Sequence, residues 1–459
     1  MIRPERGDWT LLTGATGFLG SYLLRDFLAA GRRVAVLARP DGATSPERRI
    51  TALLDRFQGE FGTPLAPPRI LHGDLSQPGL GLDAESRSWI AEHCDRMVHC
   101  AASLVFHAKG DEPYRSNVDG TRHALRLCEQ AGIEEFHHVS TAYVCGRRGG
   151  RILESDLECG QEFANDYERS KFVAEVLVHG SSVRRRAIHR ASVIVGDSRT
   201  GFTSSRDGFY AFLAFARLIG DQDKGEILRW LGLGAEDGLN LVPVDWVAAA
   251  MTELTARPAR AGVVTYHLTN PTPVPARQLV EVASSRFAGG PQAPLHGIEQ
   301  VMAVYRPYLG THAEFDVANT LRDAPELPCP RLDADMLERL VAFASDREPD
   351  AASRTAPIEV ALAIGEAGAV LDLSDPDAPR GVSAADADAA RVRAACSAAT
   401  LDRLVDGDLT VEDAVYAGLL FLEGEPARLD GAVRLVAAHL HARRGAAPRS
   451  APAPVGGGR

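Results

Sequence analysis

A glycine-rich turn near the N-terminus constrains the fold of this chain more than any other feature. The turn, Thr13–Gly20, reads TGATGFLG, follows the apolar run Trp9–Leu12 and opens a helical pattern of apolar residues. Between a strand and a helix, three such glycines permit a tight turn, close approach of a pyrophosphate, and helix packing. The sequence therefore predicts a dinucleotide site with its phosphates at the helix N-terminus. Its residues would be Gly14, Thr16, Gly17, Phe18, Leu19 and Gly20.

Composition excludes several classes of protein. The chain has 459 residues, enough for two or three domains, and its 45% hydrophobic and 24% charged content is typical of globular enzymes. The net charge of −11 argues against nucleic acid or an anionic membrane as main partner. No signal peptide and no apolar run of membrane-spanning length is apparent. Seven cysteines without a CxxC pair fit a reducing cytosol better than a disulfide framework or a zinc site, so we expect a cytoplasmic protein.

Alternating strands and helices predict the fold class. The apolar run Arg33–Ala38 indicates a second strand, Ile70–Leu75 a third strand and its turn, and Arg96–Ala102 a fourth. Residues 84–93 form a helical pattern between the last two, so βαβ units repeat. We therefore predict an α/β protein with a Rossmann, doubly wound parallel sheet.

The residue after the second strand bears on the choice of cofactor. An NAD site needs a carboxylate there for the ribose 2′-hydroxyl, whereas this strand is followed by Arg39. A guanidinium can hold a 2′-phosphate in a bidentate manner, and Arg48 and Arg49 lie close by in the sequence. A solvated arginine at a strand end is the alternative. The pattern favours NADPH.

Two later segments carry residues suited to catalysis. The predicted strand Glu135–Val139 ends in Ser140 and Thr141, at the edge where a Rossmann crevice lies, although such hydroxyls also serve turns. Tyr167 and Lys171 are four residues apart, on one face of a predicted helix. The lysine could hold the cofactor ribose, and its charge would lower the pKa of the phenol and make it a proton donor near neutral pH.

These segments together resemble the extended short-chain dehydrogenase/reductase superfamily, and within it the fatty acyl-CoA reductase and thioester reductase branch. The resemblance covers residues 8–345. The glycine turn and the Tyr-x-x-x-Lys motif are shared by the whole superfamily, whereas the Val195–Gly201 and Phe315–Asn319 segments are specific to the branch. The remaining matching segments are Gly73–Ser76, His99–Ala102, Val139–Val144 and Leu241–Asp245.

The resemblance implies roles for individual residues. Thr141 would be the catalytic hydroxyl, Tyr167 the proton donor and Lys171 its partner, which also contacts the cofactor. Asn117 would complete a proton relay beside the cofactor, with a helix N-cap as an equally good explanation. Asp74 and Leu75 would border the adenine, and Ala101 and Ala102 would line the cofactor ribose.

The resemblance also implies a domain order. Residues 1–345 form the reductase domain, with a Rossmann core at about 8–200 and 240–270 and a substrate lobe at about 202–240 and 271–345. The apolar segment 208–219 would be a helix that lines an acyl pocket or a plain core helix. Further helices are expected at 246–254, 276–287 and 332–343, with a strand at 263–268.

A polar linker, residues 346–356, separates this domain from a smaller one at 357–445. There the sequence predicts a hairpin from 358–364 and 369–373, a segment 397–418, a strand at 419–423 and a helix at 428–441. The domain resembles sterol-carrier-protein-2-like lipid-binding domains, and an unspecialised α+β accessory or dimerisation module is the alternative. Residues 446–459 would be a disordered tail.

The sequence therefore predicts an NADPH-dependent reductase of a fatty acyl thioester, bound to coenzyme A or to an acyl carrier protein. The product would be an aldehyde, with the step to an alcohol and the oligomeric state left open. The chain shows no adenylation or carrier segment, so we expect the thioester to arrive ready-made. A hydroxysteroid or other alcohol dehydrogenase, or a nucleotide-sugar epimerase, would share the fold and the cofactor. A non-catalytic Rossmann lipid-binding protein is a third alternative.

Overall fold

The structure is a computed structural model that describes residues 7–39, 44–61, 65–106, 108, 110–204, 224–231, 233–257, 261–286 and 313–346, and five strands between residues 360 and 424. The chain divides into two compact units. The first comprises Met1–Ala293 and Val304–Ala344, and the second comprises Pro294–Ala303 and Ser345–Arg459.

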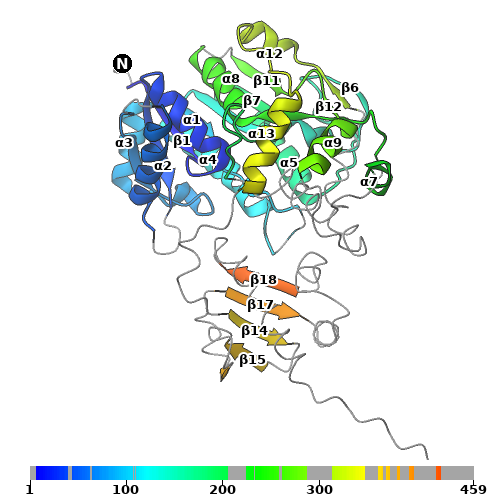
Figure 1. Ribbon diagram of the computed structural model, residues 1–459. Coiled ribbons are helices and arrows are strands. Elements are labelled where there is room, and N and C mark those ends of the chain that lie inside the picture. Colours follow the sequence, from blue (N-terminus) through cyan, green and yellow to red (C-terminus); the bar gives the residue numbers. More distant parts are fainter. Residues whose placement is uncertain are drawn as a thin grey trace, which may run out of the picture. The chain divides into compact units, whose positions relative to one another are not determined.

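The first unit is built on a seven-stranded sheet in which all neighbouring strands are parallel, in the order β11-β7-β5-β4-β1-β2-β3. Figure 1 labels β1, β7 and β11 of this sheet. The order reverses at β1, because β2 and β3 continue on one side of it and β4 lies on the other. A crevice for a ligand is expected at the carboxyl ends of the strands at this point. The predicted Rossmann fold class is confirmed. The strands are β1 (Trp9–Thr13), β2 (Arg33–Ala38), β3 (Arg69–His72), β4 (Cys94–His99), β5 (Glu135–Thr141), β7 (Arg185–Ala191) and β11 (Gly262–Leu268).

Helices cover both faces of this sheet because its strands are apolar on both sides. Leu11 and Leu12 are adjacent in β1 and both fully buried, yet they belong to different core clusters. Leu12 packs in the cluster that includes residues of α1 and α8, and Leu11 in the one that includes residues of α3 and α4. Successive side chains of a strand point to opposite faces, so a continuous apolar run indicates a sheet buried on both sides. The helices are α1 (Phe18–Ala29), α2 (Pro46–Phe61), α3 (Ala84–His93), α4 (Gly120–Ala131), α5 (Asp166–Gly180) and α8 (Val244–Ala256).

Smaller elements surround the carboxyl edge of the sheet. β10 pairs with β8, β13 with β6, both in parallel, and β12 pairs antiparallel with β9. The helices expected at 246–254, 276–287 and 332–343 correspond to α8, α9 and α13, whereas the expected apolar helix at 208–219 lies outside the described residues. The elements are η1 (Pro78–Gly81), η2 (Arg115–Asp119), η3 (Ala142–Cys145), β6 (Gly150–Ile152), β8 (Val193–Val195), α7 (Lys224–Leu231), β9 (Gly238–Leu239), β10 (Leu241–Pro243), β12 (Val274–Pro275), α9 (Ala276–Arg286), β13 (Ala313–Phe315), α12 (Ala318–Asp323) and α13 (Ala334–Asp346).

The second unit contains a five-stranded sheet of order β16-β15-β14-β17-β18. Its strands are β14 (Val360–Ile364), β15 (Ala369–Asp372), β16 (Arg380–Val382), β17 (Val392–Cys396) and β18 (Leu420–Gly424). The predicted hairpin is present, because β14 and β15 pair antiparallel. The expected segments 397–418 and 428–441 and the tail 446–459 lie outside the described residues. The resemblance to a sterol-carrier-protein-2-like domain stays a prediction.

Candidate active site

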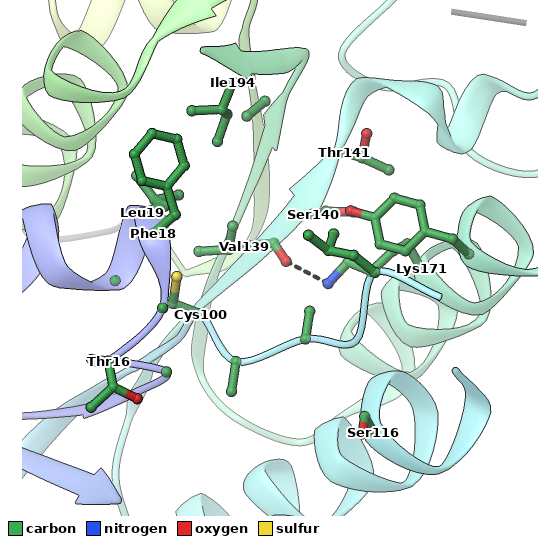
Figure 2. Close-up of a pocket in the computed structure, with 18 of the residues that line it drawn as sticks. Thr16, Phe18, Leu19, Cys100, Ser116, Val139, Ser140, Thr141, Lys171 and Ile194 are labelled. Atoms are coloured by element: carbon green, nitrogen blue, oxygen red, sulfur yellow. Dashed lines mark hydrogen bonds between the residues drawn. The ribbon is translucent and has the colours of Figure 1, made fainter. Parts of the chain in front are cut away.

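A cavity of about 800 Å³ lies at the carboxyl edge of the parallel sheet. All the site residues predicted from the sequence line it, with the exception of Asn117. Figure 2 shows Thr16, Phe18 and Leu19 of the first turn on one side, and Ser140, Thr141 and Lys171 on the other. The topology therefore brings together residues that are more than 120 positions apart in the sequence.

The glycine turn has the geometry that a dinucleotide requires. Gly14 has φ +74°, and a Cβ placed on it would lie 2.6 Å from the backbone nitrogen of Ala101. A Cβ on Gly20 would lie 1.9 Å from the carbonyl oxygen of Gly14, so any larger residue would separate α1 from the turn. Gly17 is the N-cap of α1, where no side chain caps the helix. Its N-terminal dipole is thus exposed to an anion, and the turn fits a pyrophosphate.

Two arginines lie at the end of the cavity next to β2. Arg49 of α2 donates one hydrogen bond to Thr16 Oγ1 at 2.8 Å and another to the carbonyl oxygen of Arg39 at 3.1 Å. The glycine turn, the end of β2 and α2 are therefore tied together by one guanidinium. The side chain of Arg39 lies at the exposed rim of the same cavity. Both arginines are placed where a phosphate on the adenosine ribose would meet them.

Asp74 lies beside these arginines, after β3. Its Oδ1 accepts a hydrogen bond from the backbone nitrogen of Ser76 at 2.9 Å. Burial acts to raise the pKa of Asp74, but the hydrogen bonds from Ser76 and the charges of Arg39 and Arg115 together outweigh burial. The pKa is therefore lowered overall, and Asp74 carries a negative charge at neutral pH.

Asn117 does not reach the cavity and instead connects two segments that do. Its amide nitrogen donates to Ser103 O at 2.9 Å and to Ser170 Oγ at 2.8 Å, while its oxygen accepts from Ser103 N at 2.7 Å. Asn117 lies inside the π-helical turn η2, and Asp119 precedes the first residue of α4. The N-cap explanation is therefore wrong. Asn117 fastens the loop of Ala101 and Ala102 to helix α5.

The three predicted catalytic residues come from the end of β5 and the first turns of α5. Thr141 is the last residue of β5, and its Oγ1 accepts a hydrogen bond from the backbone nitrogen of Tyr143 at 3.3 Å. The N-cap Asn165 fixes the start of α5 by accepting from Glu168 N at 2.9 Å. Lys171 is buried, and its Nζ donates to the carbonyl oxygen of Val139 at 2.6 Å (Figure 2). Helix α5 is thus attached to β5 directly beside Thr141.

The expected effect of Lys171 on Tyr167 is wrong for this structure. Burial raises the pKa of the Tyr167 phenol, and Glu168 and Cys100 raise it further, while Lys171 is not among the groups that shift it. Burial also lowers the pKa of Lys171 to about 8, against opposing effects of Glu175 and Cys100. The spacing of the two residues correctly placed them on one helix, but could not show that the ammonium is directed at β5. A phenol with a raised pKa keeps its proton at neutral pH and can donate it to an oxygen that gains negative charge.

A buried ion pair, missed in the sequence, supports the end of β5. The guanidinium of Arg190 contacts Glu175 at 2.7 Å, both side chains are almost completely buried, and Ser140 Oγ donates to the same carboxylate at 2.5 Å. Such a pair holds its segments firmly, because separating it would leave an uncompensated buried charge. One signal was available: Glu175 follows Lys171 by four residues, so the motif continues along the same helical face.

The branch-specific Phe315–Asn319 segment has a structural role and does not line the cavity. The backbone of Asn319 donates to Glu154 at 2.6 Å, and its side chain donates to the carbonyl oxygen of Thr265 at 2.9 Å. His267 of β11 bonds the carbonyl oxygen of Asp316 through Nδ1 at 2.7 Å. The segment therefore fastens β13 and α12 to the edge strand of the sheet.

The described part of the chain contains neither a cluster of metal ligands nor a membrane-spanning helix. No group of three or more His, Cys, Asp or Glu side chains there is arranged to hold a metal ion. No helix in the same residues combines the length and the apolar character needed to cross a membrane.

Known proteins with related sequences include the L-2-aminoadipate reductase of Schizosaccharomyces pombe, 29% identical over 279 residues, or 56% of this chain and 19% of that protein. Fatty acyl-CoA reductase 1 of Mus musculus is 35% identical over 157 residues, which are 32% of this chain and 30% of the relative. The chain spans no more than 30% of the length of the curated relatives it matches.

A solved structure with the same architecture is the terminal R domain from the myxalamid PKS-NRPS biosynthetic pathway. It superposes with a TM-score of 0.61 at 26% identity, covering 75% of this chain and 92% of that chain. The family model described as Male sterility protein, an NAD-binding family, matches residues 12–251, more than half of the chain. The chain therefore belongs to this family, and its first unit is a Rossmann domain of the extended short-chain dehydrogenase/reductase type that binds a nicotinamide cofactor.

Proposed function

We propose that the protein is an NADPH-dependent reductase that converts an acyl thioester, carried by coenzyme A or by a carrier protein, into an aldehyde. One observation carries the proposal: a single cavity joins the glycine turn to Thr141, Tyr167 and Lys171 and then continues along apolar side chains. The names of the relatives support the substrate class, because they include a fatty acyl-CoA reductase, and a fatty acyl-CoA is a thioester.

The apolar part of the cavity suits an acyl chain. It is formed by segments that follow β4 and β7 and by residues of β9, β10 and α9. Leu104 is 50% exposed at this wall, so a hydrocarbon chain in the cavity would cover apolar surface there. Burial of such surface by a hydrocarbon chain is favourable in water. The apolar residues of this part are Leu104, Phe106, Val193, Ile194, Leu239, Leu241 and Leu279.

The choice of NADPH over NADH rests on Arg39 and Arg49. Both side chains line the cavity next to β2, and the residue after β2 is an arginine where NAD sites carry an acidic residue. A 2′-phosphate would pair with one or both guanidinium groups. Arg49 is already held in place by Thr16 and by the carbonyl oxygen of Arg39, so little side-chain freedom is lost on binding.

A bound reduced nicotinamide supplies the hydride that the thioester carbonyl carbon accepts. Thr141 and Tyr167 then hydrogen-bond the carbonyl oxygen while negative charge grows on it, where such donors contribute most. Tyr167 gives its proton to this oxygen, and the resulting hemithioacetal loses the thiol and leaves an aldehyde. Lys171 fixes the cofactor ribose beside Tyr167. The step on to an alcohol would need a second hydride at the same site.

The test is a comparison of substrates with the full-length protein and NADPH. Palmitoyl-CoA, the same acyl group on a carrier protein, and a ketosteroid are incubated separately, and NADPH consumption, free thiol and product mass are followed. We expect thiol release and an aldehyde with one or both thioesters. NADPH consumption only with the ketosteroid would instead support the alcohol dehydrogenase alternative.

A further inference from the structure

Lys171 has a buried neighbour, His138 of β5, to which neither cofactor binding nor substrate binding assigns a role. We propose that His138 is a positioning residue: it accepts a hydrogen bond from Lys171 and, with the Val139 carbonyl oxygen, directs the remaining N–H of the ammonium into the cavity. The inference rests on the proposed function, because it assigns Lys171 to the cofactor.

The geometry around the ammonium supports this role. Lys171 Nζ lies 2.6 Å from Val139 O and 3.4 Å from Nε2 of His138. An ammonium has three donors and no acceptor, so β5 occupies two of them. Lys171 also lines the cavity, which leaves its third donor for a group bound there. Neighbouring residues of one strand thus determine where that donor points.

The surroundings of His138 indicate that Lys171 is the reason for a histidine at this position. His138 is fully buried, and its Nδ1 finds no hydrogen-bond partner among the described residues. The ring stacks on Phe136 and on His99, with centroids 6.4 and 5.7 Å apart, and a phenylalanine could do the same. An apolar ring of the same shape would avoid the cost of the unpaired nitrogen. Phenylalanine could not, however, accept the hydrogen bond that Lys171 donates to His138.

The charges around Lys171 and His138 determine in which direction the pKa of Lys171 changes when His138 is replaced. Burial lowers the pKa of His138 well below its ordinary value, and Lys171, His99 and His189 lower it further, so the imidazole is neutral and can accept. Around the ammonium, Tyr167 and Glu175 lie on α5, Cys100 follows β4, and His99 on β4 interacts with it.

An acceptor for the charged form favours that form, so we expect the pKa of Lys171 to be lower in a variant that lacks the His138 acceptor. The ammonium is lost as pH rises through its pKa. Removal of the acceptor should therefore move the alkaline loss of function to lower pH.

The experiment measures NADPH affinity by fluorescence and kcat/KM for the acyl thioester, both as functions of pH, in the full-length protein. We expect His138→Phe to shift the alkaline limb of both profiles downward by about one pH unit, which approaches a tenfold loss at pH values above both limbs. His138→Gln should restore much of the wild-type profile, because its amide oxygen can reach the position of Nε2. His138→Asn, whose amide is too short, should behave like His138→Phe.

The control is His189→Phe. His189 is also fully buried, and within the described part of the chain its Nδ1 likewise finds no hydrogen-bond partner. Its Nε2 lies 3.0 Å from Nδ1 of His137 and does not contact Lys171. His189→Phe should lower the melting temperature without moving the alkaline limb of the NADPH-affinity profile or that of the kcat/KM profile.

Two results would overturn the proposal: the same alkaline limb in His138→Phe, His138→Asn and the wild type, or an equal shift in His189→Phe. If no variant reduces a thioester, the proposed function fails, but the pH profile of NADPH binding still decides the role of His138.

Discussion

The two ends of the cavity are built in different ways. At the end formed by the glycine turn, the site is backbone: Gly14, in the turn after β1, and Gly20, in the first turn of α1, allow backbone approaches that any side chain would block. At the catalytic end, Thr141, Tyr167 and Lys171 depend on buried polar contacts from separate elements, among them Glu175 with Arg190 and Lys171 with β5. A site of the first kind can be recognised from a short motif, whereas a site of the second kind depends on side chains that the motif does not contain.

The largest expected effect is at the catalytic end. Tyr167→Phe removes the hydroxyl and keeps the ring, which packs edge-on against Phe106 with centroids 5.9 Å apart. We expect turnover of the thioester to fall about 10²- to 10⁴-fold, because the proton donor is lost. Steady-state kinetics and NADPH titration check this. An affinity for NADPH that falls as much as the turnover would show that the phenol serves binding and not proton transfer.

The next effect tests the buried support of that end. Glu175→Ala leaves Arg190 without its partner, and we expect a loss of about 3–5 kcal/mol in the free energy of unfolding. Denaturant titration measures it. The matched control is Glu253→Ala in the exposed pair with Arg257 on α8, for which we expect less than about 1 kcal/mol. Equal losses in the two variants would mean that the end of β5 does not depend on the buried pair.

A smaller effect is expected at the cofactor end. Arg49→Ala removes a guanidinium that contacts Thr16 and Arg39, and we expect NADPH affinity to fall about tenfold while NADH affinity changes little. Isothermal titration with both cofactors measures the difference. Arg229→Ala, on α7 and outside the residues that line the cavity, serves as the control. An equal fall for NADPH and NADH would contradict a role in binding the 2′-phosphate.

The smallest effect concerns pH. Under the proposed function Lys171 acts as a cation, and burial lowers its pKa to about 8, so we expect the rate to be constant below that pH and to decline above it. A pH–rate profile for kcat/KM in the wild type tests this. A rate that continues to rise well above pH 8 would show that the cation is not the active form.

The sequence predicted most of the fold and the location of the site, for a physical reason. Buried parallel strands are short apolar runs, and the turn at Gly14 needs a conformation that few other residues adopt, so both leave local signals. The bounds of α3 were predicted correctly from such a pattern.

The parts that failed depend on contacts between distant segments. The N-cap explanation for Asn117 was wrong, and its contacts became visible only when Ser103 and Ser170 were brought to it, while the proton relay stays a prediction. The pKa of Tyr167 was expected to be low because Lys171 is near in sequence, but burial determines it. The spacing of two residues on a helix shows that they share a face; it does not show which neighbouring strand the longer side chain reaches.

The most direct test of the central claim is the fate of the transferred hydrogen. The full-length protein is incubated with palmitoyl-CoA and NADPH that carries deuterium at the transferable position, and the products are analysed by mass spectrometry. The account predicts palmitaldehyde with one deuterium on the carbonyl carbon, together with free coenzyme A in equal amount. Palmitic acid without deuterium, or free coenzyme A released without oxidation of NADPH, would contradict it.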